Sequence, residues 1–130
     1  MSAKILIIED NEQNLYLATF LLQKNGPEIV QARSGPEGIE LAARVRPDLI
    51  MLDIQLPGMD GYDVARELRR NPDLIDVPIV AVTSYAMVGD RERILAAGCN
   101  AYIEKPINPE TFRSEIETAL KIRRAGGGDE

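Results

Sequence analysis

Side chains that can bind a cation or a phosphoryl group stand at the ends of four short apolar runs in this 130-residue sequence. They are Glu9, Asp10, Asp53, Thr83, Ser84, Glu104 and Lys105. Asp53 is the most informative, because it ends the apolar run "LIML" and is followed closely by a proline and two glycines. A charge at the tip of a buried strand is costly unless a neighbour neutralises it or it faces water.

The types of these residues indicate one chemistry. Asp10 and Asp53 would repel each other unless a cation lay between them, and carboxylate oxygens with retained waters are what Mg²⁺ prefers. Lys105 can offset the remaining negative charge. A carboxylate beside Mg²⁺ and a lysine can attack phosphorus, which would give an aspartyl phosphate on Asp53. The Thr83 hydroxyl can donate one hydrogen bond to a phosphoryl oxygen, so the set favours phosphoryl transfer.

The elements that must position these residues are visible in the hydrophobic pattern. The predicted strands are residues 5–8, 28–32, 49–52, 79–82 and 101–103. Four of them are apolar on successive residues, which is typical of strands covered on both faces, and the run at 28–32 is weaker. Between the strands lie segments with helical period, such as Leu15, Ala18 and Leu22 at i, i+3 and i+7.

Turn-forming residues bound the predicted helices. The first ends at residues 25–27, the second begins after Ser34, the third ends at Asn71, the fourth spans about residues 87–97, and the last begins with Pro109 at its first position. The fourth helix is the least regular, because Gly89 and Asp90 interrupt its first turn.

Strict alternation of strands and helices predicts an α/β fold with a parallel sheet, helices on both faces and right-handed crossovers. In such a sheet, ligands bind outside the carboxyl ends of the strands. With the strand order 2-1-3-4-5, three carboxylates, a hydroxyl and an ammonium would converge on one mouth. We expect one domain at residues 1–124 and a flexible polar tail at residues 125–130.

The composition restricts the alternatives. The sequence contains no histidine, which removes histidine bases, serine–histidine–aspartate triads and histidine-bound metals. A net charge of −6 argues against nucleic acid or an anionic membrane surface as the main partner. A single cysteine, Cys99, excludes an internal disulfide and favours a reducing compartment. Since no signal-like or membrane-spanning run is present, we expect a cytoplasmic protein.

Each site residue also has a purely structural interpretation. Asp10 and Gln13 have the form of a capping box, which would make Asp10 the N-cap of the first helix. Thr83 could form a cap or turn, and Lys105 could be a surface lysine. Tyr102 could be a core residue. The functional interpretation rests on the combination, since adjacent strand ends carry a matching set.

Four motifs, in order along the chain, resemble those of the receiver domains of two-component response regulators. They are "LIIEDN", "LIMLDIQLPGMDG", "VPIVAVTSYA" and "GCNAYIEKPI". The resemblance covers roughly residues 4–122 and implies a flavodoxin-like fold of five βα units. Within the family, the chain is similar to stand-alone receivers that steer cell polarity and division, and also to receivers cut from hybrid histidine kinases.

The resemblance implies a metal site and a phosphoryl site. Asp10 would bind Mg²⁺ directly and Glu9 through water, with Asp53 and the backbone carbonyl of Gln55 as further ligands. Asp53 would accept the phosphoryl group.

The resemblance also implies a switch. Thr83 and Lys105 would bind the phosphoryl oxygens, and the Lys105–Pro106 peptide would be cis. Tyr102 would reorient when Thr83 moves, and the surface of the fourth helix, fifth strand and fifth helix would change.

The partners follow from the same resemblance. The donor in this family is a phosphohistidine, which a chain without histidine cannot supply, so a histidine kinase or a histidine phosphotransfer protein must provide it. We expect a downstream protein partner, no direct contact with nucleic acid or membrane, and a monomer or weak homodimer. The protein would catalyse its own phosphorylation and slow dephosphorylation without being an enzyme in the usual sense.

Three other interpretations remain open from the sequence. A phosphatase of the haloacid dehalogenase type would need a second aspartate two residues after Asp53, where Gln55 stands. A flavodoxin-like FMN carrier would need a phosphate cradle in its first loop, where residues 9–14 are acidic instead. A receiver could also act by contact alone, without phosphorylation.

Overall fold

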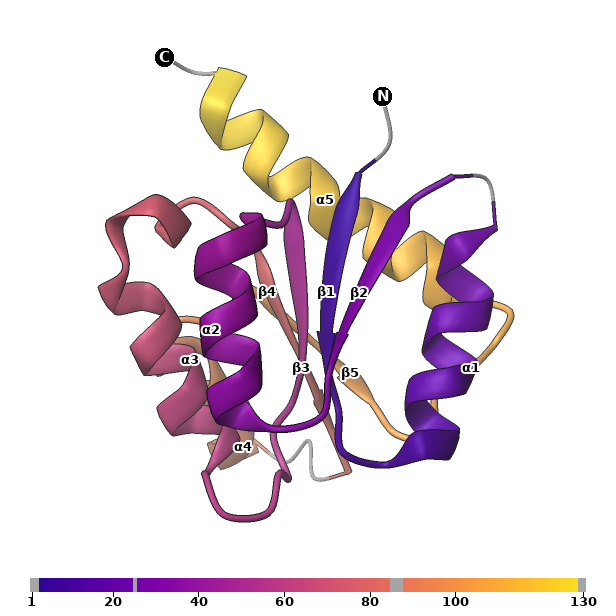
Figure 1. The fold of residues 1–130 in the computed structure, drawn as a ribbon, viewed down its shortest axis with the longest axis horizontal. Coiled ribbons are helices and arrows are strands. Elements are labelled where there is room, and N and C mark those ends of the chain that lie inside the picture. The colour runs from indigo at the N-terminus through magenta and orange to yellow at the C-terminus, as the bar shows by residue number, and fades with distance from the viewer. Residues whose placement is uncertain (1–2, 25, 85–87, 129–130) are drawn as a thin grey trace.

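A five-stranded parallel sheet forms the centre of the protein in the computed structural model, which describes residues 3–24, 26–84 and 88–128 (Figure 1). The strands are β1 (Lys4–Ile8), β2 (Glu28–Ala32), β3 (Leu49–Asp53), β4 (Ile79–Thr83) and β5 (Ala101–Glu104). Their order is β2-β1-β3-β4-β5, and every neighbouring pair is parallel. The predicted flavodoxin-like order is therefore confirmed.

Helices cover both faces of the sheet. They are α1 (Glu12–Gln23), α2 (Gly35–Val45), α3 (Gly61–Arg70), α4 (Val88–Ala96) and α5 (Phe112–Gly128), with a short 3-10 helix, η1 (Pro72–Leu74), which was not predicted. Buried residues of α1 and α5 pack on one face, and those of α2, α3 and α4 pack on the other. Side chains of a strand alternate between faces, so Ile5 and Ile7 point to the first layer and Leu6 and Ile8 to the second. This double burial explains the continuous apolar runs.

Two interpretations of helix starts need correction. Asp10 does not cap α1: the cap is Asn11, whose side chain accepts a hydrogen bond from the Asn14 N–H at 2.9 Å. The last helix begins at Phe112 and not at Pro109, because a turn at residues 109–111 comes first. α5 continues to Gly128. Residue 87, at the predicted start of the fourth helix, lies outside the described residues.

Gly61 brings the start of α3 against the segment that follows Asp53. Its N–H donates to the Ile54 carbonyl at 3.1 Å. A Cβ atom at position 61 would lie 2.4 Å from the Ile54 Cα, so only glycine allows this approach.

Arg69 connects segments at the opposite edge of the sheet from Asp53. Its guanidinium donates to the carbonyls of Leu74 (2.8 Å), Val77 (2.7 Å) and Gly98 (2.9 Å) and to the Asn100 side chain (2.8 Å). These acceptors lie in the segments that precede β4 and β5. The Arg69 side chain therefore connects both segments to α3.

Candidate functional site

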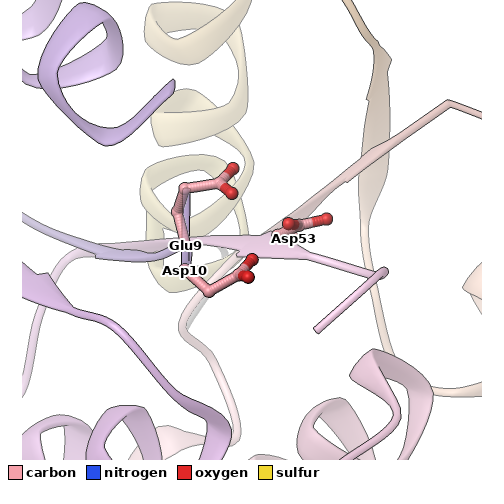
Figure 2. Close-up of side chains that lie close together, drawn as sticks. All are labelled: Glu9, Asp10 and Asp53. Atoms are coloured by element: carbon pink, nitrogen blue, oxygen red, sulfur yellow. The ribbon is translucent and has the colours of Figure 1, made fainter. Parts of the chain in front are cut away.

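Three carboxylates converge where β1 and β3 end (Figure 2). Glu9 and Asp10 directly follow β1, and Asp53 is the last residue of β3. One carboxylate oxygen from each residue lies within 4.8 Å of those from the other two. Glu9 and Asp53 are buried and Asp10 is exposed, so the cluster faces solvent through Asp10.

Lys105 supplies positive charge to this cluster. Its Nζ lies 3.1 Å from Asp53 Oδ1 and 3.9 Å from Glu9 Oε1. The backbone N–H of Lys105 donates to the Thr83 carbonyl at 2.9 Å. This bond extends the pairing of β4 with β5 by one residue beyond the end of β5. The Lys105–Pro106 peptide bond is cis, as the resemblance implied.

Each buried carboxylate also accepts a backbone hydrogen bond from two residues further on. The Asn11 N–H donates to Glu9 Oε2 at 3.1 Å, and the Gln55 N–H donates to Asp53 Oδ1 at 2.9 Å. These local bonds fix both side chains at the mouth before any ligand is present.

The proximity of the acids changes the ionisation of Glu9. Burial, which is the largest cause, acts together with a hydrogen bond to Asp53 and the negative charge of that residue to raise the pKa of Glu9 to about 7. The Asn11 amide and Lys105 act in the opposite direction. Three carboxylates facing one ammonium form a site in which a hard divalent cation would relieve repulsion, and its all-oxygen donor set fits Mg²⁺.

Thr83 ends β4 beside the cluster and is buried, with 2% of its surface exposed. It lines an open cleft of about 460 Å³ between the segment after β3 and α4. On the rim of this cleft, the Arg93 guanidinium lies 4.3 Å from the centre of the Tyr62 ring. The sequence analysis did not anticipate this cleft, because no motif marks it.

Tyr102 lies further from the acids. It pairs with Ala81 in the sheet, whereas Thr83 pairs with Glu104. Tyr102 therefore lies two residues before the position on β5 that is opposite Thr83. Its side chain is half-buried, and the Arg91 guanidinium lies 5.6 Å from the centre of its ring. The structure thus brings Glu9, Asp10, Asp53 and Lys105 together, with Thr83 at the adjoining strand end.

The Gln55 side chain makes a contact that the sequence analysis missed. Its Oε1 accepts a hydrogen bond from the Ser84 N–H at 3.1 Å. The register of β3 and β4 accounts for this contact. It pairs Asp53 with Val82 and therefore brings together the segments that follow the two strands.

The response regulator receiver domain family matches this sequence over residues 5–117. The chain belongs to this family. The receiver domain is 43% identical over 120 residues to the polar-differentiation response regulator DivK of Brucella ovis, and the match covers 92% of this chain and 98% of that protein. The family match favours a receiver of a two-component response regulator over the dehalogenase and flavin-carrier alternatives.

Solved structures agree with this membership. The receiver resembles chemotaxis protein CheY4 of Vibrio cholerae with a TM-score of 0.88 and 26% identity, over 92% of this chain and 99% of that chain. It resembles the receiver domain of sensor histidine kinase PA1611 from Pseudomonas aeruginosa PAO1 with a TM-score of 0.84 and 33% identity, over 93% and 99% of the two chains. That structure has a magnesium ion coordinated in its active site cleft. Among the described residues of our receiver, no helix has the length and apolarity needed to cross a membrane.

Proposed function

We propose that this receiver is a phosphoacceptor switch, in which Asp53 takes a phosphoryl group from a phosphohistidine on a partner protein. The observation that carries the proposal is the position of Lys105, whose ammonium lies 3.1 Å from the buried Asp53 carboxylate beside two further acids. The donor is a histidine kinase or a histidine phosphotransfer protein, because the sequence itself contains no histidine. We place this exchange in the cytoplasm, with the receiver acting as a monomer or weak homodimer.

In the proposed transfer, a carboxylate oxygen of Asp53 forms a bond to phosphorus as the phosphorus–nitrogen bond of the phosphohistidine breaks. The imidazole nitrogen keeps the electron pair of the broken bond and serves as the leaving group. Lys105 and the Thr83 hydroxyl donate to the phosphoryl oxygens, where negative charge must be stabilised. The protein contributes position and charge to the transfer, and Asp53 is the only group that forms a covalent bond.

Glu9, Asp10, Asp53 and the backbone carbonyl of Gln55 are the residues that would hold Mg²⁺. When bound, the ion supplies positive charge to the phosphoryl oxygens. Two observations support this assignment: the clustered carboxylate oxygens, and the magnesium in the related receiver of PA1611.

Phosphorylation then acts as a charge switch. It replaces the single charge of Asp53 with roughly two negative charges and adds three acceptor oxygens. Thr83 and Lys105 gain partners, Tyr102 turns inward, and the surface formed by α4, β5 and α5 shifts toward the state that a downstream protein binds.

The decisive test is the mass of the purified protein after incubation with an acyl phosphate and Mg²⁺, followed by location of the modified residue. We expect one added phosphoryl group, on Asp53, and none on the Asp53→Asn variant. Glu104→Gln is the matched control, since Glu104 is an exposed acid next to Lys105 and should not affect labelling. Undiminished labelling of Asp53→Asn would remove Asp53 from the acceptor role.

A further inference from the structure

The backbone pairing between β3 and β4 is followed by a hydrogen bond to a side chain. The last backbone bond of this ladder runs from the Ile54 N–H to the Val82 carbonyl at 3.0 Å. At the next step, the Ser84 N–H bonds to the Gln55 side chain at 3.1 Å and not to a backbone carbonyl. At Ser84, a side chain thus makes the last step of this pairing within the part of the chain that the structure describes.

From this contact we propose that Gln55 is a positioning residue, whose side-chain oxygen holds the Ser84 amide in the unphosphorylated protein and releases it to the phosphoryl group. The inference rests on the proposed phosphorylation of Asp53. It adds a hydrogen bond that holds Ser84 in the unphosphorylated state, and it assigns that bond to the carboxamide oxygen of Gln55.

Gln55 is well placed for this role, because two of its groups connect the two sides of the site. Its backbone N–H donates to Asp53 Oδ1 at 2.9 Å, while its side chain accepts from Ser84. A change at the Asp53 carboxylate therefore reaches Ser84 through a single residue.

The exchange of acceptors follows from relative hydrogen-bond strength. A charged phosphoryl oxygen is a stronger acceptor than a neutral carboxamide oxygen. Because the Gln55 contact is made by an exposed side chain, it can break while the backbone ladder up to Ile54 stays intact. A single such bond biases the resting state by about fivefold, using the usual net strength of a protein hydrogen bond.

The experiment compares two substitutions of Gln55 with a control. Gln55→Leu removes the acceptor and keeps most of the bulk, whereas Gln55→Glu keeps an acceptor oxygen. Gln23→Leu is the control, since Gln23 is exposed on α1, well away from Ser84 in the chain. In the unphosphorylated protein, NMR would measure exchange of the Ser84 amide with water, with the Ile54 amide as internal reference.

We expect Ser84 exchange to be about fivefold faster in Gln55→Leu and close to wild type in Gln55→Glu, with the Ile54 amide unchanged in both. In a second measurement, beryllofluoride, a phosphoryl mimic, is titrated in the presence of Mg²⁺. Because the Leu variant has no Gln55 bond to break, it should bind beryllofluoride about fivefold more tightly than wild type and Gln23→Leu.

The two measurements separate this inference from the function on which it rests. Unchanged Ser84 exchange in Gln55→Leu, or beryllofluoride affinity that stays equal or falls, overturns the role of Gln55 while leaving the phosphorylation of Asp53 in place. A wild-type protein that does not bind beryllofluoride overturns the proposed function, and this inference with it.

Discussion

The Lys105 ammonium lies 3.1 Å from the carboxylate of Asp53, although the two residues come from strands that are not neighbours. Lys105 follows β5 and Asp53 ends β3, so the lysine side chain reaches past the end of β4. The resulting contact places a cation against a buried carboxylate that already accepts the Gln55 amide. The energetics of the site therefore depend on this one ammonium and on the acids around it.

Replacing Lys105 with methionine tests its role in transfer. We expect Lys105→Met to slow phosphorylation by an acyl phosphate by about 100-fold, as for loss of one group that stabilises transition-state charge. The measurement is the initial rate of phosphoprotein formation at fixed Mg²⁺. Lys121→Met, an exposed lysine on α5, should leave the rate unchanged. Equal rates for Lys105→Met and wild type would contradict the assignment.

The raised pKa of Glu9 predicts how stability varies with pH. The folded protein keeps a proton on Glu9 up to about pH 7, whereas the unfolded chain releases it near the ordinary glutamate pKa of 4.5. The folded state therefore binds more protons between these values, and its contribution to the free energy of unfolding falls as pH rises. We expect a loss of roughly 1–3 kcal/mol between pH 5 and pH 8 in urea unfolding with a chelator present.

Two comparisons isolate the contribution of Glu9. Glu9→Gln should remove most of the decrease, because its side chain does not titrate. Added Mg²⁺ should stabilise the wild type more at pH 8 than at pH 5, since the ion needs the ionised carboxylate. A decrease of the same size in Glu9→Gln would assign the pH dependence to other groups.

Asp10 and Asn11 should separate metal binding from helix capping. Because Asn11 caps α1, Asn11→Ala should lower the free energy of unfolding by about 1 kcal/mol in the presence of a chelator. Asp10→Asn should change that value by less than about 0.5 kcal/mol, as is usual for an exposed residue. It should nevertheless weaken Mg²⁺ binding at least tenfold, measured by calorimetric titration. Full Mg²⁺ affinity in Asp10→Asn would refute its role as a ligand.

Gly61 tests the close approach between α3 and the segment after Asp53. Gly61→Ala should destabilise the protein by about 2 kcal/mol or more, because the added methyl group meets the Ile54 backbone at 2.4 Å. Gly89→Ala is the matched control, since a Cβ atom there meets nothing within 4 Å and alanine favours helix. Urea unfolding midpoints should therefore move in opposite directions for the two variants.

Arg69 should contribute to stability without contributing to phosphorylation. Arg69→Met leaves five acceptors without their charged donor, and we expect a loss of about 3 kcal/mol. Arg66→Met, which removes an exposed ion pair with Asp63, should cost less than about 1 kcal/mol. Below the unfolding temperature, both variants should accept phosphate at the wild-type rate. If a fully folded Arg69→Met protein accepted phosphate slowly, the edge of the sheet held by Arg69 would be coupled to the Asp53 site.

The sheet was predictable because its strands are buried on both faces. An unbroken apolar run such as "LIML" is typical of a strand that is covered on both faces. The alternation of strands and helices then predicts that the strands pair in parallel. Strand order places Glu9, Asp10, Asp53 and Lys105 at one edge without knowledge of any side-chain conformation. The acid cluster could therefore be predicted from the polar residue that follows each strand.

Local details could not be predicted in the same way. Asp10 and Asn11 are both good helix caps, and only the path of the chain shows that the second takes the position. Pro109 favours the first position of a helix, yet a turn separates it from α5. The contact between Gln55 and Ser84 depends on one exposed rotamer, which no sequence pattern specifies.

The direction of β1 has a practical consequence. The strand starts at Lys4, at the edge of the sheet away from Glu9 and Asp10, and α5 finishes near the same edge (Figure 1). A fluorescent reporter or a surface tether attached to either end would leave the acidic mouth facing solution. In immobilised protein, the acidic site should therefore remain accessible to a phosphodonor protein. Binding kinetics can then be measured on a sensor chip without redesign of the domain.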